Sequence, residues 1–83
     1  MKIAENISWK VLQNKIVAVD IVTGAYFTLN QVASEIWQAI GDGAERDEVL
    51  ARLKESYPDV APEVLEKDLD EQLTYWEQEK LIV

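Results

Sequence analysis

The sequence predicts an α+β fold in which a three-stranded antiparallel sheet is followed by three helices. Short segments rich in β-branched residues, separated by turn residues, occupy the first third of the chain. Apolar residues at helical spacing occupy the remainder. The length of 83 residues suits a single small domain, so we expect one domain spanning residues 1–83.

The first two strands are expected at residues 7–12 and 15–21. Gln13-Asn14 between them makes a two-residue hairpin loop, because Asn14 tolerates a positive φ. Alternation along the second strand indicates that one of its faces is core and that the other is only partly exposed to water.

The third strand is expected from Ala25 to Leu29, after a turn at Thr23-Gly24 in which glycine supplies a positive φ. Phe27 and Leu29 fall on one side of this strand, and Tyr26 and Thr28 fall on the other. In a simple meander it is an edge strand. The N-terminal segment or the C-terminal tail could still cover that edge, and the sequence leaves both possibilities open.

Three helices follow, at residues 31–40, 45–57 and 62–79. Asn30 is a good N-cap for the first helix, Pro58 ends the second, and Pro62 suits the first turn of the third. The inward side of the third helix consists of Leu65, Leu69, Leu73 and Trp76, with Gln72 and Tyr75 on its margin. Residues 81–83 form an apolar tail that we expect to pack back onto the domain.

Composition argues against catalysis. The chain has no cysteine and no histidine, so the usual nucleophiles and metal ligands are missing. Its carboxylates follow no calcium-loop spacing and are read as solvated helix faces. We expect no enzyme activity, no metal and no cofactor. The absence of cysteine, of a signal peptide and of an apolar run of membrane length favours a cytoplasmic protein without a membrane partner.

Two short helices followed by a longer one also give the outline of a winged helix-turn-helix domain, whose third helix would contact DNA. The net charge of −8 opposes this function. Residues 59–83 contain eight acidic and two basic residues, which would repel a phosphate backbone. We therefore expect the fold without nucleic-acid binding, and a DNA-binding regulator remains the alternative from a different class.

The edge strand offers a different function. An unpaired row of backbone N–H and C=O groups beside an apolar helix can accept an extended peptide as an additional strand. The alternative is that Tyr26, Thr28 and Tyr75 are ordinary half-exposed surface residues.

The run from Asp20 to Asn30, DIVTGAYFTLN, resembles the PqqD-like family of peptide-recognition elements. The resemblance extends over residues 8–83 and includes Ile36-Trp37, Gly43 ahead of Glu48-Val49, Asp68-Leu69 and Leu81. These elements serve pathways that modify ribosomally made peptides, and the resemblance implies a small winged-helix fold. In this chain Ala61 stands before Pro62, a position that often holds a capping acid in such domains.

The resemblance implies a non-catalytic module that captures the leader region of a precursor peptide. The leader would pair with the third strand in a groove that the third helix completes. The positions carried over are Ala25, Tyr26, Phe27, Thr28, Leu29, Leu65, Asp68, Leu69, Gln72, Tyr75 and Trp76. Asp68, at the family's characteristic acidic position, could contact the leader or fix the helix against the sheet.

Within this family we expect a stand-alone recognition protein of a lasso-peptide pathway. It would hand the precursor to a separate leader peptidase or modifying enzyme. A pyrroloquinoline quinone chaperone, or the recognition protein of another such pathway, is the alternative within the family.

Overall fold

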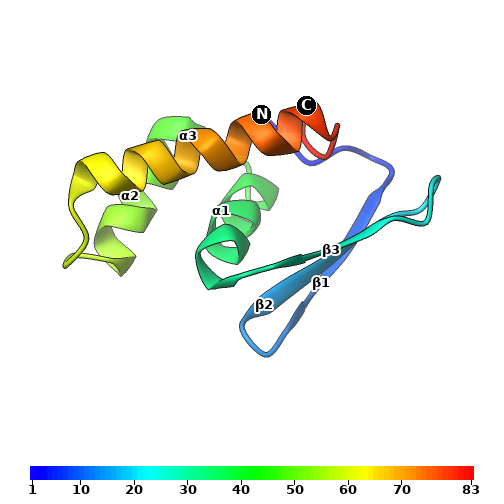
Figure 1. Ribbon diagram of the computed structural model, residues 1–83, viewed down its shortest axis with the longest axis horizontal. Coiled ribbons are helices and arrows are strands. Elements are labelled where there is room, and N and C mark those ends of the chain that lie inside the picture. The colour runs from blue at the N-terminus through cyan, green and yellow to red at the C-terminus, as the bar shows by residue number, and fades with distance from the viewer.

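The computed structural model describes residues 1–83 and confirms the expected order of elements. The strands are β1 (Ile7–Leu12), β2 (Lys15–Asp20) and β3 (Tyr26–Leu29), and the helices are α1 (Gln31–Gly41), α2 (Arg46–Ser56) and α3 (Pro62–Gln78). The sheet is antiparallel with the order β1-β2-β3. Figure 1 shows the three helices together on one side of this small sheet.

The β1–β2 hairpin has the predicted two-residue loop. Gln13 and Asn14 both adopt positive φ angles, 52° and 68°. These angles match the primed turn whose twist suits an antiparallel hairpin. The loop fixes a register in which Leu12 faces Lys15 and Trp9 faces Ala18.

β2 ends one residue earlier than expected because the side chain of Asp20 closes the following loop. Its Oδ1 atom accepts hydrogen bonds from the backbone N–H groups of Val22 and Thr23, at 2.9 and 3.2 Å. The N–H of Gly24, at a φ of 81°, donates to the carbonyl of Asp20 at 2.8 Å. The prediction that Ile21 continues the strand was therefore wrong, and this loop projects away from the helices (Figure 1).

The core lies between the inner face of the sheet and the helices. Ile16 and Ala18 supply this face from β2 and are fully buried. All three tryptophans connect the layers, because Trp37 on α1 makes edge-to-face contacts with Trp9 on β1 and Trp76 on α3. The ring centroids are 6.5 and 5.1 Å apart, which is within the favourable range for aromatic pairs.

The first residues of α1 and α3 agree with the predictions from the sequence. The Oδ1 atom of Asn30 accepts a hydrogen bond from the N–H of Ala33 at 2.9 Å, as expected for the N-cap of α1. α3 begins at Pro62 although Ala61 provides no side-chain cap. The carbonyl of Ala61 accepts from the N–H of Val64 at 3.0 Å, so backbone bonding alone starts this helix.

The two chain ends pair with each other. Ile3 and Ile82 form an antiparallel bridge, and the N–H of Lys2 donates to the carbonyl of Val83 at 2.8 Å. Leu81 and Ile82 are buried, which confirms that the apolar tail packs back onto the domain. Neither end pairs with β3, and this strand keeps a free edge.

Candidate functional site

The free edge of β3 presents the backbone groups of Tyr26 and Thr28. Its other edge pairs with β2, where the N–H of Asp20 donates to the carbonyl of Ala25 at 2.8 Å. Bonded and non-bonded pairs alternate along an antiparallel ladder, so Phe27 is the next residue bonded to β2. The N–H and C=O groups of Tyr26 and Thr28 therefore point away from the sheet, toward open space.

Ser34 on α1 joins the end of β3 to β2. Its hydroxyl accepts from the N–H of Ile16 at 2.9 Å and donates to the carbonyl of Leu29 at 3.1 Å. Ser34 is buried, so both bonds are shielded from water. The hydroxyl thus fixes the junction between β3 and α1 relative to the sheet.

Two neighbouring cavities lie beside the β3 edge, between the β3–α1 junction and α3. The larger, about 450 Å³, extends along α1, and the smaller, about 190 Å³, lies against β3. They share four lining residues, namely Asn30, Ala33, Gln72 and Tyr75. We call the two together the β3–α3 groove.

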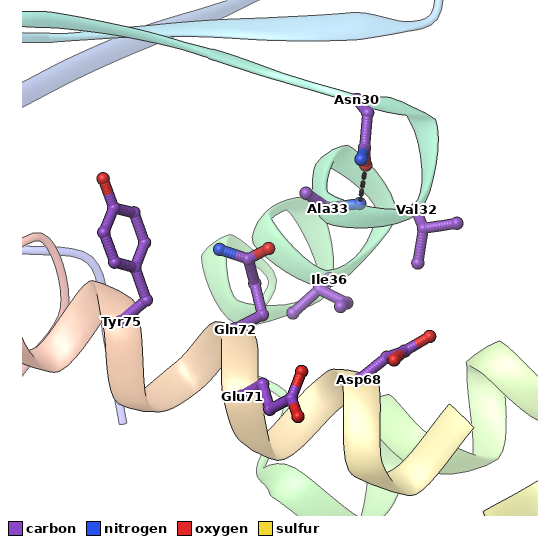
Figure 2. A pocket seen from close by; sticks show the side chains of 8 residues that line it. All are labelled: Asn30, Val32, Ala33, Ile36, Asp68, Glu71, Gln72 and Tyr75. Carbon is purple, nitrogen blue, oxygen red and sulfur yellow. Dashed lines mark hydrogen bonds between the residues drawn. The ribbon is translucent and has the colours of Figure 1, made fainter. Parts of the chain in front are cut away.

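The groove has an apolar floor and a polar outer wall. Val32, Ala33 and Ile36 line its α1 side. Figure 2 shows Gln72 and Tyr75 extending from α3 into the space in front of α1. A side chain that enters the groove would meet apolar atoms beneath it and hydrogen-bonding groups at its rim.

Two carboxylates line the part of the groove that does not touch β3. Asp68 and Glu71 lie on the α3 side of the larger cavity (Figure 2). Asp68 makes no ion pair, and Glu71 has a single distant one with Lys67 at 4.0 Å. This end of the groove therefore favours a neutral or cationic occupant over an anionic one.

An ion-pair network holds α3 in place from the side opposite the groove. The guanidinium of Arg46, at the start of α2, donates two hydrogen bonds to Asp70, at 2.8 and 2.9 Å, and one to Glu66 at 2.9 Å. The bond from Arg46 lowers the pKa of the Asp70 carboxyl below its ordinary value. The network ties α2 to α3 and so helps to orient the outer wall of the groove.

The structure brings together seven of the eleven positions expected from the sequence. Those that line the groove are Phe27, Thr28, Leu29, Asp68, Gln72, Tyr75 and Trp76. Ala25 and Tyr26 lie on the exposed part of β3 and the loop before it, and neither lines the groove. Leu65 and Leu69 are buried in the core, at 4% and 0% exposure, and line neither cavity.

Four groove residues were not among the expected site residues for a common reason. Val32, Ala33 and Ile36 carried only a helical core pattern, and Asn30 only a capping signal. Which flank of α1 is left uncovered depends on how α3 crosses it, and no local pattern encodes that crossing. Glu71 was missed because one acid among many on α3 carries no distinguishing signal.

No group of three or more aspartate or glutamate side chains gathers in a way that could hold a metal ion. None of the helices combines the length and the hydropathy that a membrane span requires.

Solved structures provide the first comparison. The chain is similar to a structure described as TbiB1 in complex with the TbiA(beta) leader peptide, with a TM-score of 0.92 and 27% identity. The match covers 99% of this chain and 94% of that one. A structure described as lasso peptide synthetase B1 complexed with the leader peptide matches with a TM-score of 0.87 and 24% identity, covering 99% and 95%. At this lower identity the likeness shows the fold alone.

Comparison with protein families gives the second result. No curated protein matches the sequence. Residues 15–82, most of the chain, match the family described as Coenzyme PQQ synthesis protein D (PqqD). This confirms the resemblance seen in the sequence, and the chain belongs to the PqqD family.

Proposed function

We propose that the β3–α3 groove binds the leader region of a ribosomally synthesised precursor peptide as an additional strand on β3. The observation that carries this proposal is the open edge of β3 directly beside an apolar groove. Its relatives support the same ligand, since the similar structures were solved with leader peptides. The bound leader would extend the sheet to four strands.

The backbone of β3 supplies the pairing. Tyr26 and Thr28 offer two donors and two acceptors to an added strand, each net hydrogen bond contributing about 0.5–1.5 kcal/mol. These bonds select for an extended peptide of any sequence. Specificity must therefore come from the side chains that enter the groove.

The groove supplies that specificity. In an added strand, alternate side chains face the same side as Phe27 and Leu29, and so enter the space between β3 and α3. Burying two or three apolar leader side chains contributes about 1.5–3 kcal/mol each. Ordering a flexible peptide opposes this by about 2–5 kcal/mol, in addition to the general cost of association. The balance permits a Kd near micromolar or below.

In this proposal the protein is not an enzyme. It presents the captured precursor to a separate leader peptidase or modifying enzyme of a lasso-peptide pathway, in the cytoplasm. The choice of a lasso-peptide pathway rests on the sequence resemblance to recognition proteins of such pathways. The acidic surface of α3 supports a peptide ligand over nucleic acid, because carboxylates repel phosphates. Asp68 would act within the groove, at the end that favours a neutral or cationic leader residue.

A proline at position 28 tests the pairing. Thr28→Pro removes an N–H that faces the open edge and is not part of the ladder with β2, so the fold should persist. Its affinity for a labelled lasso leader peptide, measured by fluorescence anisotropy, should fall at least about tenfold, because a donor is lost and the ring obstructs pairing. Thr28→Val keeps the N–H and the branched shape, and it should bind like the wild type.

Two further measurements make the test decisive. Amide exchange at Tyr26 and Thr28 should slow when the leader is added to the wild-type protein, which requires no variant. A folded Thr28→Pro protein with unchanged affinity, together with unchanged exchange in β3, would show that the leader binds elsewhere. Tighter binding of a pyrroloquinoline quinone precursor than of a lasso leader would assign the chain to that other pathway.

A further inference from the structure

The outer face of the sheet is uncovered, and it carries several apolar side chains. The helices pack against the side that carries Ile16 and Ala18, which leaves the opposite face to solvent. We define the docking face as seven residues, five on the outward side of the sheet and two in the β2–β3 loop. Its members are Lys10, Lys15, Val17, Val19, Ile21, Val22 and Tyr26.

The three most exposed large apolar residues of the protein are among these seven. Val22 is 78% exposed, Tyr26 71% and Ile21 68%. Tyr26 lies opposite Val19 in the β2–β3 register, so the two side chains are neighbours on the outward face of the sheet. Exposed apolar side chains that share one surface often mark an interaction site.

Hydrogen bonds hold the backbone of the loop that carries Ile21 and Val22. The Asp20 carboxylate accepts hydrogen bonds from the N–H groups of Val22 and Thr23. The N–H of Ile21 donates to the carbonyl of Asn6 at 3.0 Å. The N–H of Ala25 donates to the hydroxyl of Thr23 at 3.2 Å. These bonds order the backbone that carries the apolar side chains, which lowers the backbone entropy lost when a partner binds.

A hollow lies beside this patch. It has a volume of about 340 Å³ and is lined by Ser8, Trp9, Lys10, Val17 and Val19. The two valines and Trp9 are its apolar members, and Lys10 is the one charged residue that lines it. A partner side chain could seat there with an acidic neighbour close to Lys10.

The charge of the chain is divided between its two halves. Residues 1–29 carry three basic and two acidic residues, whereas residues 30–83 carry five basic and fourteen acidic residues. Lys10 and Lys15 are exposed and make no ion pair. The docking face therefore matches an apolar surface flanked by carboxylates, and the acidic helices would repel that same surface.

The docking face is continuous with the proposed leader site. Tyr26 contributes its side chain to the docking face and its backbone to the open edge of β3. A leader added at this edge would extend the sheet, and its outward side chains would continue the docking face. A partner bound here would touch both the protein and the captured peptide.

We propose that the docking face binds the enzyme that acts on the captured precursor, through an apolar patch on that enzyme flanked by acidic side chains. This inference rests on the proposed leader binding. It explains how the captured precursor reaches the enzyme, because the leader and the enzyme would both bind along β3 without competing for the same surface. In this arrangement the β3–α3 groove binds the leader, and the docking face binds the partner enzyme.

The test separates the two surfaces. Val22→Asp replaces an exposed apolar side chain with a negative charge, which would repel the acidic side chains of the partner. The variant keeps the backbone N–H of residue 22 that donates to Asp20. Lys10→Glu reverses the charge beside the hollow. Val60→Asp makes the same change as Val22→Asp on an exposed valine in the α2–α3 connection, and serves as the control. Each variant is checked for its fold by circular dichroism and for its leader affinity by anisotropy.

The readout is cleavage of the precursor by the purified leader peptidase of the same pathway, at a limiting concentration of this protein. Val22→Asp and Lys10→Glu should each lower the stimulated rate at least about tenfold while leader affinity stays within about twofold of wild type. Val60→Asp should stimulate cleavage like the wild type. Ile21→Ser, which removes apolar area without adding charge, should give an intermediate loss.

Three results would overturn the inference. Wild-type stimulation by both Val22→Asp and Lys10→Glu would place the enzyme on another surface. A wild-type dimer that Val22→Asp converts to a monomer in sedimentation, with cleavage unchanged, would assign the face to a second copy of the chain. Equal loss of leader affinity and cleavage in these variants would make the face part of the peptide site. Failure of the leader to bind the wild-type protein would refute the proposed function itself.

Discussion

Ser34→Ala tests the bridge between β2, β3 and α1. The serine hydroxyl is the partner of the Ile16 N–H and of the Leu29 carbonyl, and no backbone group replaces it. Ile16 is fully buried and Ser34 is 5% exposed, so water cannot take over either bond. Alanine fits the same space and removes only the oxygen, which isolates the effect of the two hydrogen bonds.

The expected loss follows from leaving a buried donor without a partner. An unsatisfied buried N–H costs about 1–3 kcal/mol, and the Leu29 carbonyl loses a donor as well. We therefore expect the free energy of unfolding to fall by about 2 kcal/mol. For a domain of this size that corresponds to a decrease in Tm of roughly 8–16 °C.

Urea unfolding followed by circular dichroism measures this loss. Ser8→Ala makes the same change on an exposed strand residue and should alter the free energy of unfolding by less than about 0.5 kcal/mol. If Ser34→Ala is as stable as Ser8→Ala, the hydroxyl does not hold the junction and the reasoning fails. Reduced leader affinity in a Ser34→Ala protein that remains folded would show that the junction also orders the groove.

Three other predictions concern stability. Leu69→Lys should unfold the protein, because it buries a charge at a fully enclosed position, whereas Val64→Lys on the exposed side of the same helix should leave the far-UV spectrum unchanged. Gly24→Ala should lower the free energy of unfolding by about 1–2 kcal/mol in urea titrations, because φ is +81° even though the added methyl meets no neighbour. Arg46 lowers the pKa of Asp70 in the folded state, so the stabilisation from this pair is complete above the ordinary aspartate pKa and is lost as pH falls through the folded-state value. The urea midpoint should therefore drop more between about pH 5 and pH 3 in wild type than in Asp70→Asn.

These predictions have distinct contradicting outcomes. A native spectrum for Leu69→Lys would mean that α3 can turn this position to solvent, as a groove wall would require. A Gly24→Ala variant of wild-type stability would mean that the loop adopts a negative φ there. Identical acid profiles for wild type and Asp70→Asn would show that the exposed pair contributes nothing measurable, as many surface ion pairs do.

Local chemistry explains why the elements could be predicted. Asn14 marked the hairpin loop, Asn30 marked the start of α1, and Pro62 marked the start of α3, because each acts through backbone geometry within a few residues. The strand end at Asp20 was misplaced by one residue. Alternating apolar residues continue through Ile21, and the side-chain bonds that stop the strand do not change that pattern.

The candidate site was only partly predictable because it depends on packing between elements. Helical spacing identified Leu65 and Leu69 as apolar positions, but spacing cannot distinguish a groove wall from a core. The structure places both in the core and gives the wall to Gln72 and Tyr75 on the adjacent side of the helix. The bridge made by Ser34 was also invisible, since it joins residues that lie far apart in the sequence.

The edge-to-face series of tryptophans makes the protein its own optical probe. Trp76 lines the smaller cavity of the groove, and its ring contacts Trp37, which in turn contacts Trp9. A peptide side chain seated in that cavity would change the packing around the Trp76 indole and alter the excitonic coupling of the series. Because the chain has no other tryptophan, near-UV circular dichroism and emission can follow occupancy of the groove in unlabelled protein.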